Sequence, residues 1–304
     1  MTQSTTGISQ RDRAEADFKP STSRRHALDW AFAVLVFIAA MIGLVVLAVL
    51  LVDIAVDGVP RLSWGFITSF PSSFPENAGV YPALLGSLFL LLFIALLSVP
   101  VGVGAAIYLE EYAPDNWLTR VIEINISNLA GVPSIIYGLL GLALFVNYLG
   151  PITGGKSVLS GALTLTLLIL PVIIIATREA LRAIPDTVRE GGFALGATRW
   201  EVVRSHLLPM ALPGALTGTI LALSRAIGEA APLIVVGAAT YITFAPDSPF
   251  SEYSALPIQI FSWISQPQEG FQIDAAAGIV VLMAVLILAN SFAIWLRNRY
   301  QRRT

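Results

Sequence analysis

Six long runs of apolar residues, each with almost no charge, divide the chain of 304 residues. A helix needs about 20 such residues to cross the hydrocarbon core of a membrane, whereas amphipathic soluble elements alternate apolar and polar positions. The pattern therefore predicts an all-α membrane protein with six transmembrane helices. We place these spans at residues 28–52, 81–109, 121–148, 158–177, 212–240 and 275–296.

The second and third runs exceed the length of one crossing, so they can tilt or bend, and Pro100 and Pro133 are the expected bend points. The first run is too long for the core of a signal peptide and has no clear cleavage site, which favours a retained anchor. Residues 1–27 are polar, and we expect a disordered cytoplasmic tail there. Residues 28–304 then form the transmembrane domain.

Positive charge is distributed unevenly between the two sides of these spans. Fifteen of the 18 Lys and Arg residues fall in the tail, the second and fourth connections and the C-terminal end, while Arg61 and Lys156 lie on the opposite side. Arg225 falls inside the fifth span. Because cytoplasmic loops carry the excess of Lys and Arg, both termini are expected in the cytoplasm.

Composition excludes several classes of function. Hydrophobic residues make up 56% of the chain and charged residues only 12%, so lipid is the expected surroundings. The net charge of -2 provides no positive electrostatic field that would attract nucleic acid. There is no Cys and there are only two His, which excludes thiol chemistry and makes a metal site improbable. No constellation of catalytic side chains emerges, so we expect no enzyme activity from this chain.

One segment imitates a nucleotide-binding loop. Residues 150–157 match G-x-x-x-x-G-K-[ST] letter for letter, and Asp53 follows an apolar run as a magnesium-binding Asp would. A phosphate-binding loop needs a strand before it and a helix after it, whereas transmembrane runs flank this segment and Pro151 removes one N–H donor. We interpret it as a Gly/Pro turn between the third and fourth spans, with Asp53 ending the first span.

The fourth connection, residues 184–209, predicts a compact helix-turn-helix on the cytoplasmic side. Thr187 with Glu190, and Thr198 with Glu201, fit the capping box in which a hydroxyl and a carboxylate satisfy free N–H groups at a helix start. Gly196 is expected to end the first helix in a left-handed conformation, and Pro209 fits a break before the fifth span.

This loop exposes apolar side chains, namely Phe193, Leu195 and Trp200. Two readings stay open for them: a surface on which a partner protein docks, and a loop that folds back on the helical bundle.

Arg225 and Glu229 form the principal candidate site, because a charge inside a membrane is costly and marks a transport path by default. The two residues are one helical turn apart and can neutralise each other, which is the purely structural alternative. In the functional reading, the planar fork of Arg225 binds a tetrahedral oxyanion. Glu229 can accept a hydrogen bond from the P–OH group of phosphate, whereas sulfate has no such donor and is repelled. Pro232 provides a possible hinge beside the pair.

The cytoplasmic start of the third span provides a further group, Glu123, Asn125 and Asn128. These side chains could line an inner gate, and a solvated helix end is the alternative.

Several motifs resemble those of ABC importer permeases. The series Glu190, Gly191, Gly192, Gly196, Leu208, Pro209 has the E-A-A-x-x-x-G-x(9)-I-x-L-P spacing of their coupling loop, with Gly in place of both Ala and His206 in place of Ile. Outside the loop, the chain from about residue 60 onward is similar to phosphate-specific transport permeases of the PstA type. The segments that carry this likeness are 62–64, 81–83, 106–113, 131–138 and 228–233, together with Arg225.

The resemblance implies a type I permease that passes inorganic phosphate along Arg225 and Glu229 by alternating access in the bacterial inner membrane. Its coupling loop, Trp200 included, would insert into a cleft of a separate ATPase, which would bind the ATP and magnesium; this chain itself would bind no cofactor. The implied partners are a second, PstC-type permease, two copies of a PstB-type ATPase and an extracytoplasmic PstS-type phosphate-binding protein. A permease for sulfate or molybdate and an ATPase-independent secondary transporter remain the alternatives.

Overall fold

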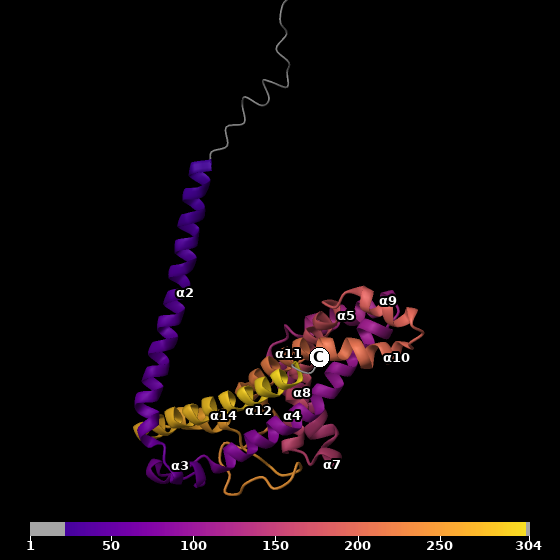
Figure 1. Cartoon of the computed structure of the whole chain (residues 1–304). Coiled ribbons are helices and arrows are strands. Elements are labelled where there is room, and N and C mark those ends of the chain that lie inside the picture. The colour runs from indigo at the N-terminus through magenta and orange to yellow at the C-terminus, as the bar shows by residue number, and fades with distance from the viewer. Residues whose placement is uncertain (1–21, 302–304) are drawn as a thin grey trace, which may run out of the picture. The chain divides into compact units, whose positions relative to one another are not determined.

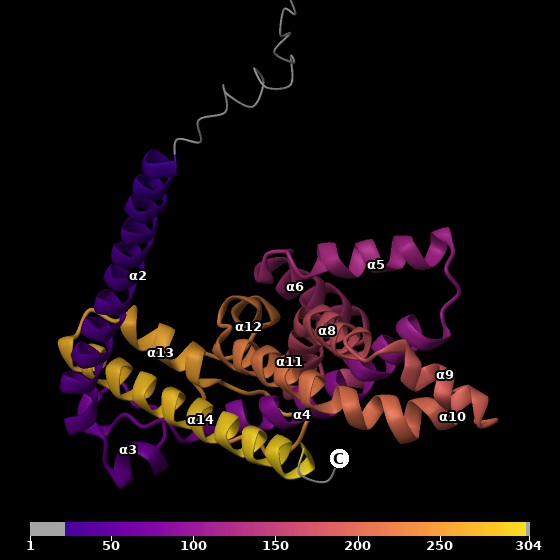
Figure 2. The ribbon, with the colours of Figure 1, turned by 45° about the horizontal axis from the view of Figure 1, so that its top comes forward.

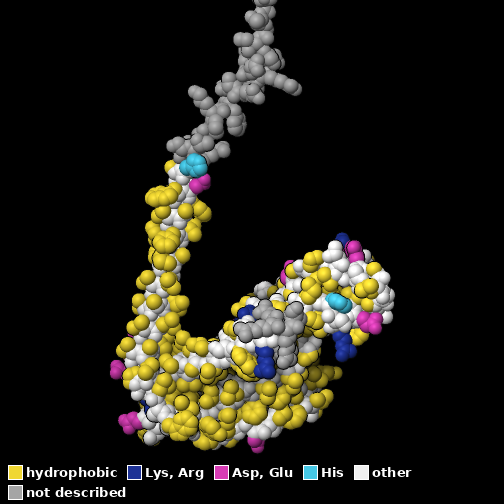
Figure 3. All heavy atoms as spheres, viewed as in Figure 1, with side chains coloured by type: hydrophobic (Ala, Val, Ile, Leu, Met, Phe, Trp, Pro, Cys, Tyr) yellow, Lys and Arg dark blue, Asp and Glu magenta, His cyan; other side chains and the backbone are white. Residues whose placement is uncertain are grey.

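The structure is a computed structural model that describes residues 22–301, and within this range it consists of helices and connecting loops without strands. The first 21 residues of the predicted tail and the last three residues of the chain lie outside the described residues. The expected all-α fold is confirmed for the described part. Hydrophobic side chains cover most of the surface visible in Figure 3, as expected of a protein surrounded by lipid.

Helix α2, Thr22–Gly58, is one uninterrupted helix that begins before the predicted start at residue 28 (Figure 1). Residues up to Asp53 form a compact unit of their own, in which none of the side chains from His26 to Asp53 is buried. The prediction that Asp53 ends the first span was wrong. The apolar residues that follow Asp53 continue the helix to Gly58, because a single charged side chain does not interrupt helical hydrogen bonding.

The second unit, Ile54–Thr304, contains all the other described helices. Three of its helical segments, marked η3, η4 and η5, have the wider π-helical turn. The elements are η1 (Val59–Arg61), α3 (Trp64–Thr68), η2 (Pro75–Asn77), α4 (Tyr81–Ile107), η3 (Tyr108–Tyr112), α5 (Trp117–Leu129), α6 (Ser134–Gly141), η4 (Leu142–Tyr148), α7 (Gly150–Thr153), α8 (Val158–Arg182), α9 (Asp186–Ala194), α10 (Arg199–Val202), η5 (Val203–Leu207), α11 (Leu208–Gly228), α12 (Ala231–Val236), α13 (Leu256–Ile264) and α14 (Glu269–Gln301).

Helix α8 is the centre of this unit and packs between α4 and α11 (Figure 2). Small residues allow the close approach: a Cβ on Gly218 would lie 2.2 Å from Cβ of Ala176, and one on Gly214 would lie 2.7 Å from Cβ of Ala180. These two pairs also show that α11 runs antiparallel to α8. Gly102 of α4 contacts Ile173 of α8.

The third predicted span, 121–148, is not a single helix. Helix α5 ends at Leu129, and the α6 and η4 segment begins at Ser134 after a bend of 105°. Pro133 causes the break, since it lacks an N–H and disfavours helical geometry at the residue before it. The predicted bend at Pro133 is therefore confirmed, whereas Pro100 is accommodated inside α4. Within the described residues, five helices are long and apolar enough to cross a membrane, and the bent pair makes up to six.

The fifth predicted span, 212–240, also has different bounds. Helix α11 ends at Gly228, Glu229 is extended with ψ of 109°, and the short α12 follows from Ala231. The ring of Pro232 would clash with the carbonyl of Gly228 in a continuous helix, which explains the break. At the other end, the helix continues from Arg199 through Pro209, so the predicted break at Pro209 was wrong. The π-helical segment η5 ends at Leu207, two residues before Pro209.

At the end of the second unit that carries Arg61, the loop before α4 is tied to α14. Arg61 Nε donates to Asp274 Oδ1 at 2.7 Å, and Arg61 Nη2 donates to the carbonyl oxygens of Pro75 at 2.7 Å and Ala78 at 3.1 Å. The Asp274 side chain is completely buried. One guanidinium therefore holds three chain segments together.

The segment that imitates a nucleotide-binding loop is a turn, as expected. Gly150–Thr153 form the short helix α7, and Gly154 and Gly155 have φ of 83° and 73°, values that favour glycine. Ser157 then caps the start of α8.

Candidate functional site

Arg225 and Glu229 meet where the fifth predicted span is interrupted. Arg225 lies in the last turn of α11, and its Nε donates to Glu229 Oε1 at 3.4 Å. Glu229 is the first residue beyond the helix, so its backbone leaves the helical path while its side chain still reaches back by one turn. The predicted proximity of the two side chains is confirmed, and a helix break now accompanies it.

The packing of α11 gives the depth of this pair. Since Gly218 faces Ala176 in an antiparallel arrangement, Arg225 comes level with Ile169, near the middle of the apolar run 158–177. Ser224, the residue before Arg225, donates to Asn290 Oδ1 at 2.7 Å, well inside α14. Both neighbouring helices therefore put the pair far from the polar ends of the bundle.

The two interrupted spans touch each other. Helix α12 packs on α6, and a Cβ on Gly138 would lie only 2.8 Å from Cα of Pro232. A break in a membrane helix leaves backbone groups without helical partners, and such breaks are tolerated where they are covered by protein or line a watered cavity. The arrangement resembles the discontinuous helices that bind ions near the midplane of secondary transporters.

The pair lies partly at the surface of the chain. The Arg225 side chain is 47% exposed and that of Glu229 is 22% exposed. A charged surface at this depth cannot face lipid cheaply. This face therefore needs a covering of protein or water rather than lipid.

The connection between α8 and α11 forms a helix, a turn and a second helix, α9 and α10. Gly196 has φ of 81°, as predicted, and follows the end of α9. The capping box of Thr198 with Glu201 is present at the start of α10. The box predicted for Thr187 with Glu190 was wrong, because α9 already begins at Asp186 and Thr187 lies inside it.

The predicted docking side chains are exposed in this chain. Phe193, Leu195 and Trp200 have exposed fractions of 48%, 91% and 56%, and Glu190 is exposed on α9. Leu208 and Pro209 are half-buried at the start of α11. The loop thus has an uncovered apolar surface beside its charged residues, and docking on it stays a prediction.

The two glycines that replace Ala in the coupling motif differ in their surroundings. Nothing lies within 4 Å of a Cβ on Gly191, whereas a Cβ on Gly192 would lie 2.7 Å from Cγ2 of the buried Val202. We expect Gly191→Ala to stabilise α9 by roughly 0.5–1 kcal/mol, since Ala loses less backbone entropy than Gly. Gly192→Ala should instead destabilise the loop by about 1–3 kcal/mol through overpacking.

Proteolysis rates of the loop in the assembled protein would measure this difference, with Gly191→Ala cut more slowly and Gly192→Ala more rapidly than the parent. Equal rates for the two variants would contradict the packing of α9 on α10.

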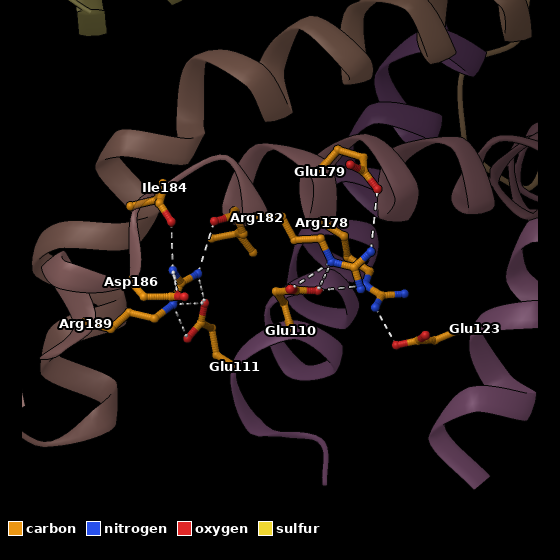
Figure 4. Close-up of polar contacts among 10 residues, drawn as sticks. Glu110, Glu111, Glu123, Arg178, Glu179, Arg182, Ile184, Asp186 and Arg189 are labelled. Atoms are coloured by element: carbon orange, nitrogen blue, oxygen red, sulfur yellow. Dashed lines mark hydrogen bonds and ion pairs between the residues drawn. The ribbon is translucent and has the colours of Figure 1, made fainter. Parts of the chain in front are cut away.

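A cluster of ion pairs at the end of α4 was not predicted (Figure 4). Glu111 in η3 accepts from Arg189 of α9, with Nη2 to Oε1 at 2.8 Å and Nε to Oε1 at 3.2 Å. This hydrogen bond raises the pKa of Arg189 above its usual value. Glu110 accepts from Arg182 at 2.9 Å and from Arg178 at 3.2 Å. In addition, Arg199 donates to the carbonyl oxygen of Glu111 at 2.9 Å. The end of α4 is thus joined to the loop and to α8.

The three side chains predicted as an inner gate lie on α5 but have different partners. Glu123 forms an ion pair with Arg178 of α8. Asn125 donates to the carbonyl oxygen of Val121 within its own helix at 2.7 Å. Asn128 lies in the last turn of α5 and is exposed. Only Glu123 joins the charged cluster, and a gating role for the three residues stays a prediction.

The sequence held a weak signal for this cluster. Glu110 and Glu111 lie at the end of an apolar run, and their arginine partners are 68–88 residues away in the chain. In the sequence these arginines indicated only which side faces the cytoplasm. Pairing over such separations depends on how the helices pack.

The chain matches known proteins along most of its length. Residues 98–304 match the family described as "Binding-protein-dependent transport system inner membrane component". The probable ABC transporter permease protein YqgI of Bacillus subtilis is 37% identical over 80% of this chain and 86% of its own length. The phosphate transport system permease protein PstA 1 of Mycobacterium tuberculosis is 33% identical over 94% of this chain and 93% of its own.

Among solved structures, a bacterial alginate ABC transporter in complex with its pentasaccharide-bound periplasmic protein has the same fold. Its matching chain has a TM-score of 0.64 and 15% identity, and the match covers 90% of this chain and 97% of that one. At this identity the likeness concerns the fold alone.

Proposed function

The chain belongs to the binding-protein-dependent transport system inner membrane components, and from this premise we propose that it is one permease subunit of an ATP-driven importer of inorganic phosphate. It is a multi-pass inner-membrane subunit. The proposal that phosphate is the transported anion rests on the pair of Arg225 and Glu229 at a helix break, together with the likeness to phosphate transport system permeases.

The chemistry of the pair suits phosphate. The guanidinium of Arg225 presents several N–H donors in one plane, which match two oxygens of a tetrahedral anion. Glu229 lies next to this fork, and its carboxylate can accept a hydrogen bond from the P–OH group that phosphate still carries near neutral pH. Sulfate would bring only acceptors to the same carboxylate, so the pair favours phosphate over sulfate.

The α9 and α10 loop supports coupling to a separate ATPase. Its exposed Phe193, Leu195 and Trp200 provide an apolar docking surface, and its arginines are bonded to the end of α4. ATP and magnesium would bind to the two copies of that ATPase. A second permease would complete the path beside Arg225, and a phosphate-binding protein would deliver the anion at the end that carries Arg61. Both termini would then lie in the cytoplasm.

Competition for uptake tests the choice of cargo. Vesicles that contain the whole transporter, its binding protein and ATP should accumulate labelled phosphate. Excess unlabelled phosphate should abolish accumulation of the label, and an equal excess of sulfate should leave it unchanged. Equal competition by both anions would contradict phosphate as the selected cargo.

Glu229→Gln should relax this selectivity. The amide retains the shape of Glu229, removes the negative charge and supplies an N–H donor that sulfate can accept. We expect sulfate to become a competitor, with about a tenfold change in the ratio of the two half-inhibiting concentrations. Asp115→Asn, a change of the same kind in an exposed ion pair, is the matched control and should leave the ratio as in the parent.

A further inference from the structure

Arg178 has two carboxylate partners on different helices. Its Nε donates to Glu110 Oε2 at the end of α4, and its Nη2 forms an ion pair with Glu123 of α5 (Figure 4). The Arg178 side chain is only 10% exposed, so leaving it without a partner would be costly. Because Glu110 remains bonded to it, Arg178 can release Glu123 and still be paired.

Besides this ion pair, α5 is held to the rest of the chain mainly by the half-buried Ile126, which packs on the cluster of Ala106, Leu109 and Ile174. None of its residues is buried, and its contacts with the long helices are mainly those with α8. Apolar side chains such as Trp117, Leu118 and Ile124 are exposed along it. A helix without a buried face is retained by few interactions, so a single ion pair weighs heavily in its position.

The C-terminal end of α5 is connected, through α6, to the segment beside Arg225 and Glu229. The break at residues 130–133 connects α5 to α6, and Tyr137 of α6 donates to the carbonyl oxygen of Leu129 at 2.8 Å. Gly138 of α6 then packs on Pro232, three residues beyond Glu229. A movement of α5 therefore reaches α6 and the segment beside the pair.

The cluster of ion pairs at the end of α4 is also bonded to the α9 and α10 loop. Glu110 and Glu111 are neighbours in η3, and Glu111 is bonded to Arg189 of α9 and, through its carbonyl oxygen, to Arg199 of α10. A displacement of the loop therefore moves Glu111, which is the neighbour of Glu110, the partner of Arg178.

We propose that the ion pair between Arg178 and Glu123 is a releasable latch that positions α5 and makes access at the Arg225 and Glu229 pair depend on the state of the α9 and α10 loop. This inference rests on the proposed function. Arg178 and Glu123 are positioning residues, since they act on the path through α5 and α6. Without the latch, ATP hydrolysis continues but is no longer matched to transport, so the ATP consumed per phosphate imported rises.

The absence of Cys from the chain permits a sharp test. In Glu123→Cys, the side chain at a position that is 32% exposed can be alkylated in the reconstituted transporter. Iodoacetate adds a carboxylate close in length to Glu, whereas iodoacetamide adds a neutral amide of the same size. The parent transporter, treated in parallel, reports any reaction with other subunits, and Asp115→Cys is the control for an exposed carboxylate near the start of α5.

We expect Glu123→Cys to raise the ATP consumed per phosphate about fivefold or more, within the usual range of coupling between sites. Iodoacetate should return the ratio toward that of the parent, iodoacetamide should not, and the Asp115 variant should match the parent throughout. An unchanged ratio in Glu123→Cys, or equal rescue by both reagents, would overturn the latch. If the parent itself imports no phosphate, the proposed cargo fails instead, and the two failures are thereby distinguished.

Discussion

Replacing Arg225 by Gln should lower phosphate uptake by about 100-fold or more. A hydrogen bond to a charged group contributes roughly 1.5–3 kcal/mol, so losing two of them costs at least two factors of ten in binding or rate. In the proposed function, the guanidinium of Arg225 is the group that attracts the anion into the path. Initial rates of uptake, normalised to the amount of assembled transporter in the membrane, measure the effect.

Two further variants separate transport from insertion. Arg225→Gln alone leaves Glu229 without its partner inside the membrane, which could impair insertion. The double variant Arg225→Gln with Glu229→Gln removes both charges and should insert normally while remaining inactive. Arg120→Gln, in an exposed pair, should transport as the parent does. Normal uptake by the double variant would mean that the two charges serve only to neutralise each other.

Asp274→Ala should have the largest effect on stability. It removes the buried carboxylate and leaves Arg61, which also holds the loop before α4, without its ionic partner. Breaking a buried ion pair from one side costs about 3–5 kcal/mol. For a chain of this size we expect the thermal midpoint of the assembled transporter in detergent to fall by about 10 °C.

The conservative change at this position is the matched control. Asp274→Asn keeps an oxygen that can accept from Arg61 Nε, so its midpoint should fall by less than half as much as that of the Ala variant. A parental midpoint for Asp274→Ala would show that the interaction of Arg61 with backbone carbonyls suffices to hold this end of the protein together.

Much of the fold could be predicted from residues that are close together in the sequence. The free energy of transferring a run of apolar residues into lipid is a sum over neighbouring positions, so the long helices could be located approximately from the sequence. The capping box of Thr198 with Glu201, the left-handed Gly196 and the proximity of Arg225 to Glu229 each involve residues within one turn of each other, and all three predictions are confirmed.

Other features depended on the packing of distant segments. The proline signal at residue 133 predicted a bend, but nothing in the local sequence gave its angle of 105° or the packing of α5 and α6 on α8. Pro209 and Pro232 look alike in the sequence, yet the helix passes one and ends before the other. Pro209 comes shortly after the π-helical segment η5, which can accommodate a missing N–H, whereas the helix before Pro232 is a regular α-helix.

The sequence by itself determined which segments are apolar enough to cross a membrane, that Arg225 and Glu229 lie one turn apart within one of them, and how the start of α10 is capped, because each depends on residues close together along the chain. Only the tertiary structure decided which arginine meets Glu110, Glu111, Glu123 and Asp274, and that the two interrupted spans touch at Gly138 and Pro232. The physical reason is that an ion pair or a close backbone contact needs atoms within a few ångströms, and only packed helices bring segments so far apart in sequence to that distance.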